Sequence, residues 1–344
     1  MNNIKQYKSG KIIFIKGDKI IDNIKVGNII ICGKSDKTPI GFIEKIINIE
    51  YINADIVFST QPAVIEDAFE YLEIHKEINS EIIYKNSPHE IIGNEGILFK
   101  PTKEYFDIAF NINKPYYLEI YKSGKQKIYA NGTLSVKPSL FFDYKYEKSS
   151  VTYIILRGSL SIDDITNLYG ENLLLKTPPP EKSVYLTKVL IPIFTGINIA
   201  VDIYAIGGLT GYIYGSMSMG FKAGIDRPYI GASYQNGKVV FSASGGNPYF
   251  NIIDPRFDSS FNCKTYVGPK MVFSVYPSKL LANAFVKGNI YNKLVVSTTS
   301  LQYKDCYGIE AILGFQILTK VLNNPPINLY EKCVNLKYKK YSLR

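Results

Sequence analysis

The sequence predicts a mainly β protein, made of antiparallel sandwich or meander domains with a small N-terminal β-barrel-like unit and two short helices. Short apolar runs recur between clusters of turn-forming residues, which is typical of strands joined by tight turns. The chain contains 28 Tyr and 18 Phe, and aromatic residues favour strands. Long stretches of the C-terminal half alternate between apolar and polar side chains with period two.

Three sections follow one another along the chain. We expect a small β unit ending in a helix at 1–78, a middle β-sandwich region at 79–182, and an antiparallel β meander with a basic tail at 183–344. A chain of 344 residues can hold two or three domains, each with its own core. Its 46% hydrophobic and 20% charged residues are ordinary for a globular protein.

The first section contains four short apolar runs that favour strands, at 12–15, 29–32, 41–47 and 55–59. A helix is expected next. Thr60 is a suitable N-cap and Pro62 would lie in the first turn, while Val64, Ala68 and Leu72 recur at helical spacing.

The middle section favours strands at 105–112, 116–121, 127–130 and 152–156. Asn131-Gly132 is a strong two-residue hairpin signal. Ser161 is expected to begin a short helix that ends at Gly170, with Asp163 and Asp164 in its first turn. Three consecutive prolines at 178–180 exclude helix and central strand, so this stretch is interpreted as a linker.

The third section shows the clearest alternation of apolar and polar side chains. Apolar and small or polar residues separate at period two over 216–223 and again over 239–244. The Asn236-Gly237 pair predicts a turn just before the second of these runs. Strands are also expected at 271–276, 283–286, 294–299 and 308–318. This pattern predicts an antiparallel meander with one face on a core and the other partly in water.

Positive charge is concentrated near the C-terminus. The net charge is +10, and the stretch from residue 260 onward holds 12 Lys+Arg against 3 Asp+Glu, or +9. A basic tail can bind an acidic surface, including that of a neighbouring subunit. The candidate assembly contacts are Lys337, Tyr338, Lys339, Lys340, Tyr341 and Arg344.

The four cysteines, Cys32, Cys263, Cys306 and Cys333, lie far apart and contain no C-x-x-C pair, so we expect no metal site. They are interpreted as ordinary buried thiols; a Cys263–Cys306 bridge between neighbouring strands is the alternative. The N-terminus lacks the apolar core of a signal peptide, and the longest apolar stretch, 184–219, is interrupted by charges and glycines. No leader or transmembrane helix is therefore expected.

No catalytic signature stands out. The two histidines, His75 and His89, belong to no local nucleophile or metal motif, and no G-x-S-x-G, phosphate loop or calcium loop occurs. Asp163 and Asp164 are interpreted as helix-capping residues. We therefore expect no catalytic residue, cofactor site or metal site, and no enzyme activity.

The leading hypothesis is a non-catalytic, self-assembling structural protein, such as a shell, appendage, surface-layer or crystal subunit, with further copies of itself as partner. It would act at a cell or particle surface or in an intracellular assembly. The alternative is a β-rich binding module or toxin-like protein that attaches to glycans, lipids or a membrane surface. An enzyme is the third hypothesis, since catalytic groups can assemble in space without a sequence motif. No nucleic-acid-binding motif occurs, so specific nucleic-acid binding is not expected.

Overall fold

The structure is a computed structural model. It describes residues 4–337 apart from 9, 16–20, 34, 39–40, 79–96, 102–105, 111, 148–149, 195–196, 236, 258–260, 279–281, 298–301 and 318–319. The chain is mainly β, and its described strands form a five-stranded, a 14-stranded and a two-stranded sheet, all antiparallel. The predicted fold class is confirmed.

The small N-terminal sheet has the strand order β1-β2-β5-β4-β3. Its members are β1 (Ile4–Lys8), β2 (Lys11–Ile15), β3 (Ile29–Cys32), β4 (Phe42–Ile52) and β5 (Asp55–Pro62), with the 3-10 turn η1 (Ile21–Asn23) between β2 and β3. Phe14 and Phe58 are fully buried in its own core, with ring centroids 5.4 Å apart.

The helix expected from Thr60 onward is wrong except for one turn. β5 continues to Pro62, because Thr60 and Gln61 pair with β4 and the Thr60 hydroxyl donates to Glu44 instead of capping a helix. The single turn α1 (Ile65–Ala68) follows, and β6 (Tyr71–Ile78) begins soon after it.

The large sheet contains most of the chain. Its strands are β6, β9 (Ile112–Ser123), β10 (Gln126–Glu147), β11 (Ser150–Leu175), β12 (Lys182–Phe194), β13 (Ile197–Asp226), β14 (Tyr229–Gln235), β15 (Lys238–Ser244), β16 (Asn247–Phe257), β17 (Phe261–Tyr276), β18 (Ala282–Ser297), β19 (Gln302–Ile317), β20 (Lys320–Asn323) and β21 (Ile327–Lys337). The two-stranded sheet pairs β7 (Ile97–Pro101) with β8 (Phe106–Phe110).

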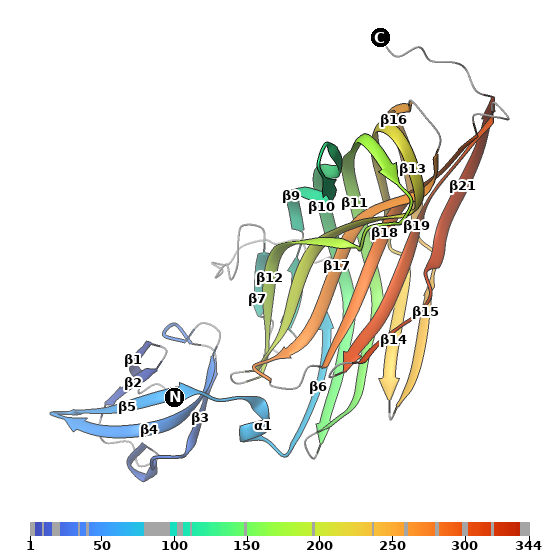
Figure 1. Ribbon diagram of the computed structural model, residues 1–344. Helices are drawn as coiled ribbons and strands as arrows, with labels where there is room; N and C mark the ends of the chain where they lie inside the picture. The colour runs from blue at the N-terminus through green and yellow to red at the C-terminus, as the bar shows by residue number, and fades with distance from the viewer. Residues whose placement is uncertain are drawn as a thin grey trace.

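The large sheet folds over on itself into two layers (Figure 1). The first layer contains β9, β10, β11, β14, β15 and β16, and the second contains β12, β17, β18, β19 and β21. The 30-residue strand β13 belongs to both, since its first half pairs with β12 and β17 and its second half with β11 and β16. The result is sandwich-like, with one continuous core between the layers.

Aromatic contacts join the two layers. Phe142 on β10 lies 6.4 Å from Phe273 on β17, and Phe241 on β15 lies 6.0 Å from Phe315 on β19, measured between ring centroids. Phe142, Phe273 and Phe315 are at most 1% exposed. Burial of such large rings is a main source of stability in a sandwich core.

Two local expectations in the middle section are wrong. Residues 161–170 lie within β11, where Asp163 faces outward and Asp164 inward, because β10 and β13 pair with this stretch on its two sides. Asn131-Gly132 lies within β10 and makes no turn. Gly132 is needed there for space: an added Cβ would lie 2.0 Å from the Ile165 carbonyl oxygen.

The predicted boundary near residue 182 is a short loop within the large sheet, since strands on both sides of it belong to that sheet. The small sheet contacts the sandwich through α1. The Ile65 amide donates to the Pro277 carbonyl at 3.1 Å, and the Ser278 hydroxyl donates to Glu66. Figure 1 shows this sheet at one end of the sandwich.

Candidate functional site

The outer face of the second layer carries four lysines, Lys264 and Lys270 on β17 and Lys287 and Lys293 on β18, and is called the lysine face below. Lys264 lies directly opposite Lys293, and Lys270 directly opposite Lys287. Cys263 and Met271, which alternate with the β17 lysines, belong to the core, so these lysines point away from it. Like charges in directly opposite positions destabilise a sheet, so each pair needs compensation.

Glu181 provides that compensation for Lys270 and Lys287. It lies in the loop before β12, and its carboxylate accepts from the Lys287 ammonium at 2.6 Å and from the Tyr266 hydroxyl at 3.3 Å. Lys270 lies 5.6 Å from the centre of the Phe285 ring, within cation–π range. Burial lowers the pKa of Lys270, and the charge of Lys287 lowers it further.

Glu310 on β19 compensates Lys264. This carboxyl group is 3% exposed, and it accepts from Lys264 at 2.5 Å and from the Asn289 amide at 3.1 Å. The Lys264 ammonium also lies 4.0 Å from the centre of the Tyr291 ring. A buried carboxylate with two donors is well satisfied, which is the condition for a stabilising buried ion pair.

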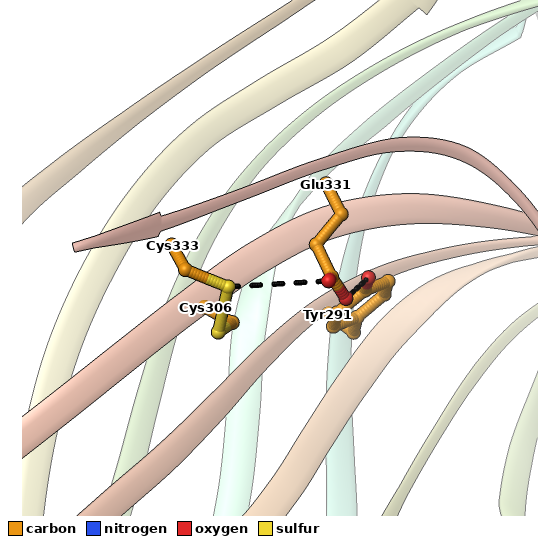
Figure 2. Close-up of a disulfide and its surroundings, with 4 residues drawn as sticks. All are labelled: Tyr291, Cys306, Glu331 and Cys333. Carbon is orange, nitrogen blue, oxygen red and sulfur yellow. Dashed lines mark hydrogen bonds between the residues drawn. A yellow bond between two sulfur atoms is a disulfide. The ribbon is translucent and has the colours of Figure 1, made fainter.

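Tyr291 extends across the lysine face from β18 towards β21. Its hydroxyl donates to Glu331 at 2.5 Å. The ring is buried over Gly308, where an added Cβ would lie 2.7 Å from it. Figure 2 shows Tyr291 and Glu331 beside the disulfide of Cys306 and Cys333, whose Cys333 sulfur lies 3.9 Å from a Glu331 oxygen.

The disulfide corrects the expectation that the cysteines are ordinary thiols. Cys306 on β19 and Cys333 on β21 are directly opposite in the register and are joined, whereas Cys32 and Cys263 are free. The Cys263–Cys306 alternative is also wrong, because Cys263 faces the core and Cys306 the outer face. A cross-strand bond of this kind ties the edge strand β21 to the sheet.

A cavity of about 280 Å³ opens on the lysine face. It is lined by Thr210, Gly211, Asn262, Cys263, Lys264, Tyr291, Lys293, Asn328 and Glu331. These residues come from β13, β17, β18 and β21; the first three are neighbours in the sheet, and β21 lies beyond β19. The lining combines ammonium, carboxylate, amide and hydroxyl groups, a set suited to binding a small polar molecule through hydrogen bonds.

Cys263 borders the cavity, but its side chain belongs to the core. Burial raises the pKa of its thiol to about 12, so it carries almost no thiolate at neutral pH. Among the described residues, no group of three or more His, Cys, Asp or Glu is placed to hold a metal ion. In the same part of the chain, no helix is long and apolar enough to cross a membrane.

The open edges of the large sheet form a second candidate surface. Within the described ranges, β9, β12, β16 and β21 each pair with a neighbour on one side only. The first three contain a proline, at Pro115, Pro192 and Pro248, and β21 contains the charged pair Glu331-Lys332. Proline and charge on an edge strand prevent pairing with another chain.

Strand β15 is an open edge without these features. It pairs only with β14 among the described strands, and its seven residues, KVVFSAS, contain no proline and no charge after Lys238. Val239, Phe241 and Ala243 pack against the core, whereas Val240 on the opposite face is 63% exposed. Such a strand offers its free backbone groups to a further strand.

Most of the predicted assembly contacts lie outside the described residues: Tyr338, Lys339, Lys340, Tyr341 and Arg344. Lys337 is the last residue of β21. Sequence reasoning missed the four face lysines and the cavity, because nothing in the sequence indicates the register that aligns residues from four strands. Three cysteines in the last 82 residues were the one available signal for the disulfide.

No protein-family model matches this chain, and no curated protein or solved structure matches it either.

Proposed function

We propose that this protein is a structural subunit that assembles with further copies of itself by adding strands at the open edge β15. The composition of β15 carries this proposal. The other long edge strands of the described sheet contain proline or charge, and β15 has neither beyond its first residue. An edge strand of this composition is the natural place for controlled edge-to-edge pairing.

The side chains around this edge support the same proposal. Val240 and Tyr229 point outward from β15 and β14 and are 63% and 47% exposed. Ser242 and Ser244 lie on the same outer face, so beyond Lys238 this face is uncharged and partly apolar. A second copy related by a twofold axis would meet this same surface, as symmetric dimers require.

The basic tail is a second element of the proposal. The chain from residue 260 onward has a net charge of +9, whereas the first 259 residues have +1. A tail containing Lys339, Lys340 and Arg344 would hold an acidic surface of the next subunit, and salt would weaken that contact. Removal of residues 338–344 is then expected to lower the assembly size, most clearly at low salt.

The substitution Val240→Lys tests the role of β15 in assembly. Because Val240 is exposed, the substitution costs the monomer little, and a lysine in the middle of an edge strand opposes pairing with a further strand. We expect sedimentation velocity to show smaller species for this variant than for the wild type. Leu174→Lys is the matched control, because Leu174 is also apolar and 61% exposed but lies on β11, inside the sheet.

Comparing the two variants distinguishes pairing at β15 from a general effect of added charge. A smaller species for Val240→Lys alone supports pairing at β15. Equal sizes for the wild type and both variants would overturn the proposal, and equal loss in both variants would assign the effect to added charge. Far-UV circular dichroism of each variant confirms that the monomer still folds.

A further inference from the structure

The cavity on the lysine face is separate from the β15 edge and has its own chemistry. It lies on the second layer and β15 on the first. Its volume of about 280 Å³ equals that of roughly nine water molecules, since each occupies about 30 Å³ in the liquid. That space suits a single sugar ring with its substituents.

Positive charge in the lining points to an anionic group on the ligand. Lys264 and Lys293 are directly opposite on neighbouring strands, and both line the cavity. Glu310 pairs with Lys264 but lies outside the lining, and it is 3% exposed. Glu310 offsets the charge of Lys264, and an anion placed between the two ammonium groups would add a counter-charge for Lys293.

The remaining lining groups suit hydroxyls. Asn262 and Asn328 provide amides that both donate and accept, and Thr210 provides a hydroxyl. Glu331 is the one carboxylate among the described residues of the lining; it accepts from Tyr291 and has further lone pairs for a hydroxyl donor. Lys264 and Gly308 cover the Tyr291 ring, so recognition would rest on hydrogen bonds and not on ring stacking.

We propose that this cavity binds a sugar that carries a carboxylate, with the carboxylate at Lys264 and Lys293 and the hydroxyls at the amides and Glu331. The proposal goes beyond self-assembly, since it gives the subunit a ligand. Free acidic sugars and acidic units of a polysaccharide share this chemistry.

The test is calorimetric titration of the full chain at low salt with glucuronate, glucose and inorganic sulfate. We expect glucuronate to bind at least about tenfold more tightly than either of the others, because a hydrogen bond to a charged group contributes about that factor. An oligomer of glucuronate then distinguishes a polysaccharide unit from a free sugar, since the polymer source predicts tighter binding of the oligomer.

Lys293→Gln should weaken glucuronate binding about tenfold. The matched control is Lys222→Gln, an exposed lysine on β13 whose neighbours are the first-layer strands β11 and β16, and it should leave binding unchanged. Equal binding of glucose would overturn the role of the carboxylate, and equal binding of sulfate would overturn the role of the sugar. Absence of glucuronate binding at millimolar concentration would overturn the site, whatever the assembly state.

Discussion

Asp164 is a carboxyl group placed in the hydrophobic core. It is fully buried on β11 and accepts a hydrogen bond from the Tyr116 hydroxyl at 3.3 Å. The hydroxyl of the nearby Thr166 is also hydrogen-bonded to Tyr116. Burial raises the pKa of Asp164 to about 7, and the neighbouring charge of Asp163 adds to the rise, against the hydrogen bonds of Thr166 and Tyr116. The ionised form of this group is therefore costly in the folded chain.

This pKa predicts a pH-dependent stability. The unfolded group has a pKa near 4, so between about pH 4 and 7 the folded chain keeps a proton that the unfolded chain releases. The contribution is fully present below about pH 4 and is lost above about pH 7. We predict that Asp164→Asn raises the free energy of unfolding by about 1–3 kcal/mol at pH 8 and changes it little at pH 4.

Urea titrations at the two pH values measure this difference. Glu119→Gln is the control, because its side chain is 45% exposed on β9 and forms a surface ion pair with Lys122. An Asp164→Asn effect of the same size at both pH values would show that proton binding is not its cause.

Glu310 forms a buried ion pair whose contribution to stability can be measured. It pairs with Lys264 below the surface, so Glu310→Gln leaves Lys264 facing Lys293 without a counter-charge. We predict a loss of about 1–3 kcal/mol in the free energy of unfolding. Glu171→Gln breaks the exposed pair of Glu171 and Lys127, whose side chains are 43% and 45% exposed, and should cost clearly less. Equal losses in both variants would contradict the role of burial.

Residue identity alone misled the sequence analysis at Asn131-Gly132 and at Asp163-Asp164. Both pairs have strong local preferences, for a turn and for a helix N-terminus. In the fold, Gly132 provides space for the neighbouring strand β11, and Asp164 joins a core network with Tyr116. Tertiary contacts decided both cases, and a single sequence does not contain them.

At the scale of elements, the strands were easier to predict than their ends. The period-two alternation at 216–223 lies within β13, and the run at 239–244 corresponds to β15. The lengths were missed: β10, β11 and β13 span 22, 26 and 30 residues because each pairs with different neighbours along its length. Polar residues inside these long strands were therefore predicted to form turns or to end strands.

Strand β21 is held at the edge of the sheet by a disulfide. The Cys306–Cys333 bond joins it to β19 across 27 residues of sequence. We predict that reduction lowers the free energy of unfolding by about 2–4 kcal/mol. Amide exchange should rise first in β21, since it is an edge strand.

The double variant Cys306→Ala/Cys333→Ala is the control for that measurement. A reductant should change the stability of the wild type and leave the double variant unchanged. If both respond alike, the buried thiols Cys32 and Cys263 or another effect of the reductant would be responsible, against the prediction.

At the scale of the whole molecule, the two outer faces of the sandwich differ. The second layer presents the lysine face with its cavity and disulfide. The first layer presents a stack of tyrosines, Tyr117, Tyr129 and Tyr169, with neighbouring ring centroids 5.7 and 4.9 Å apart, and ends at the open edge β15. This division leaves the assembly edge and the proposed ligand site on separate layers.

The mass of the wild-type protein in solution tests the central proposal most directly. One chain has a mass of 38.8 kDa. Light scattering over a range of protein concentrations, at low and at high salt, should give a mass several times larger that rises with concentration. A constant mass of one chain under every condition would contradict self-assembly.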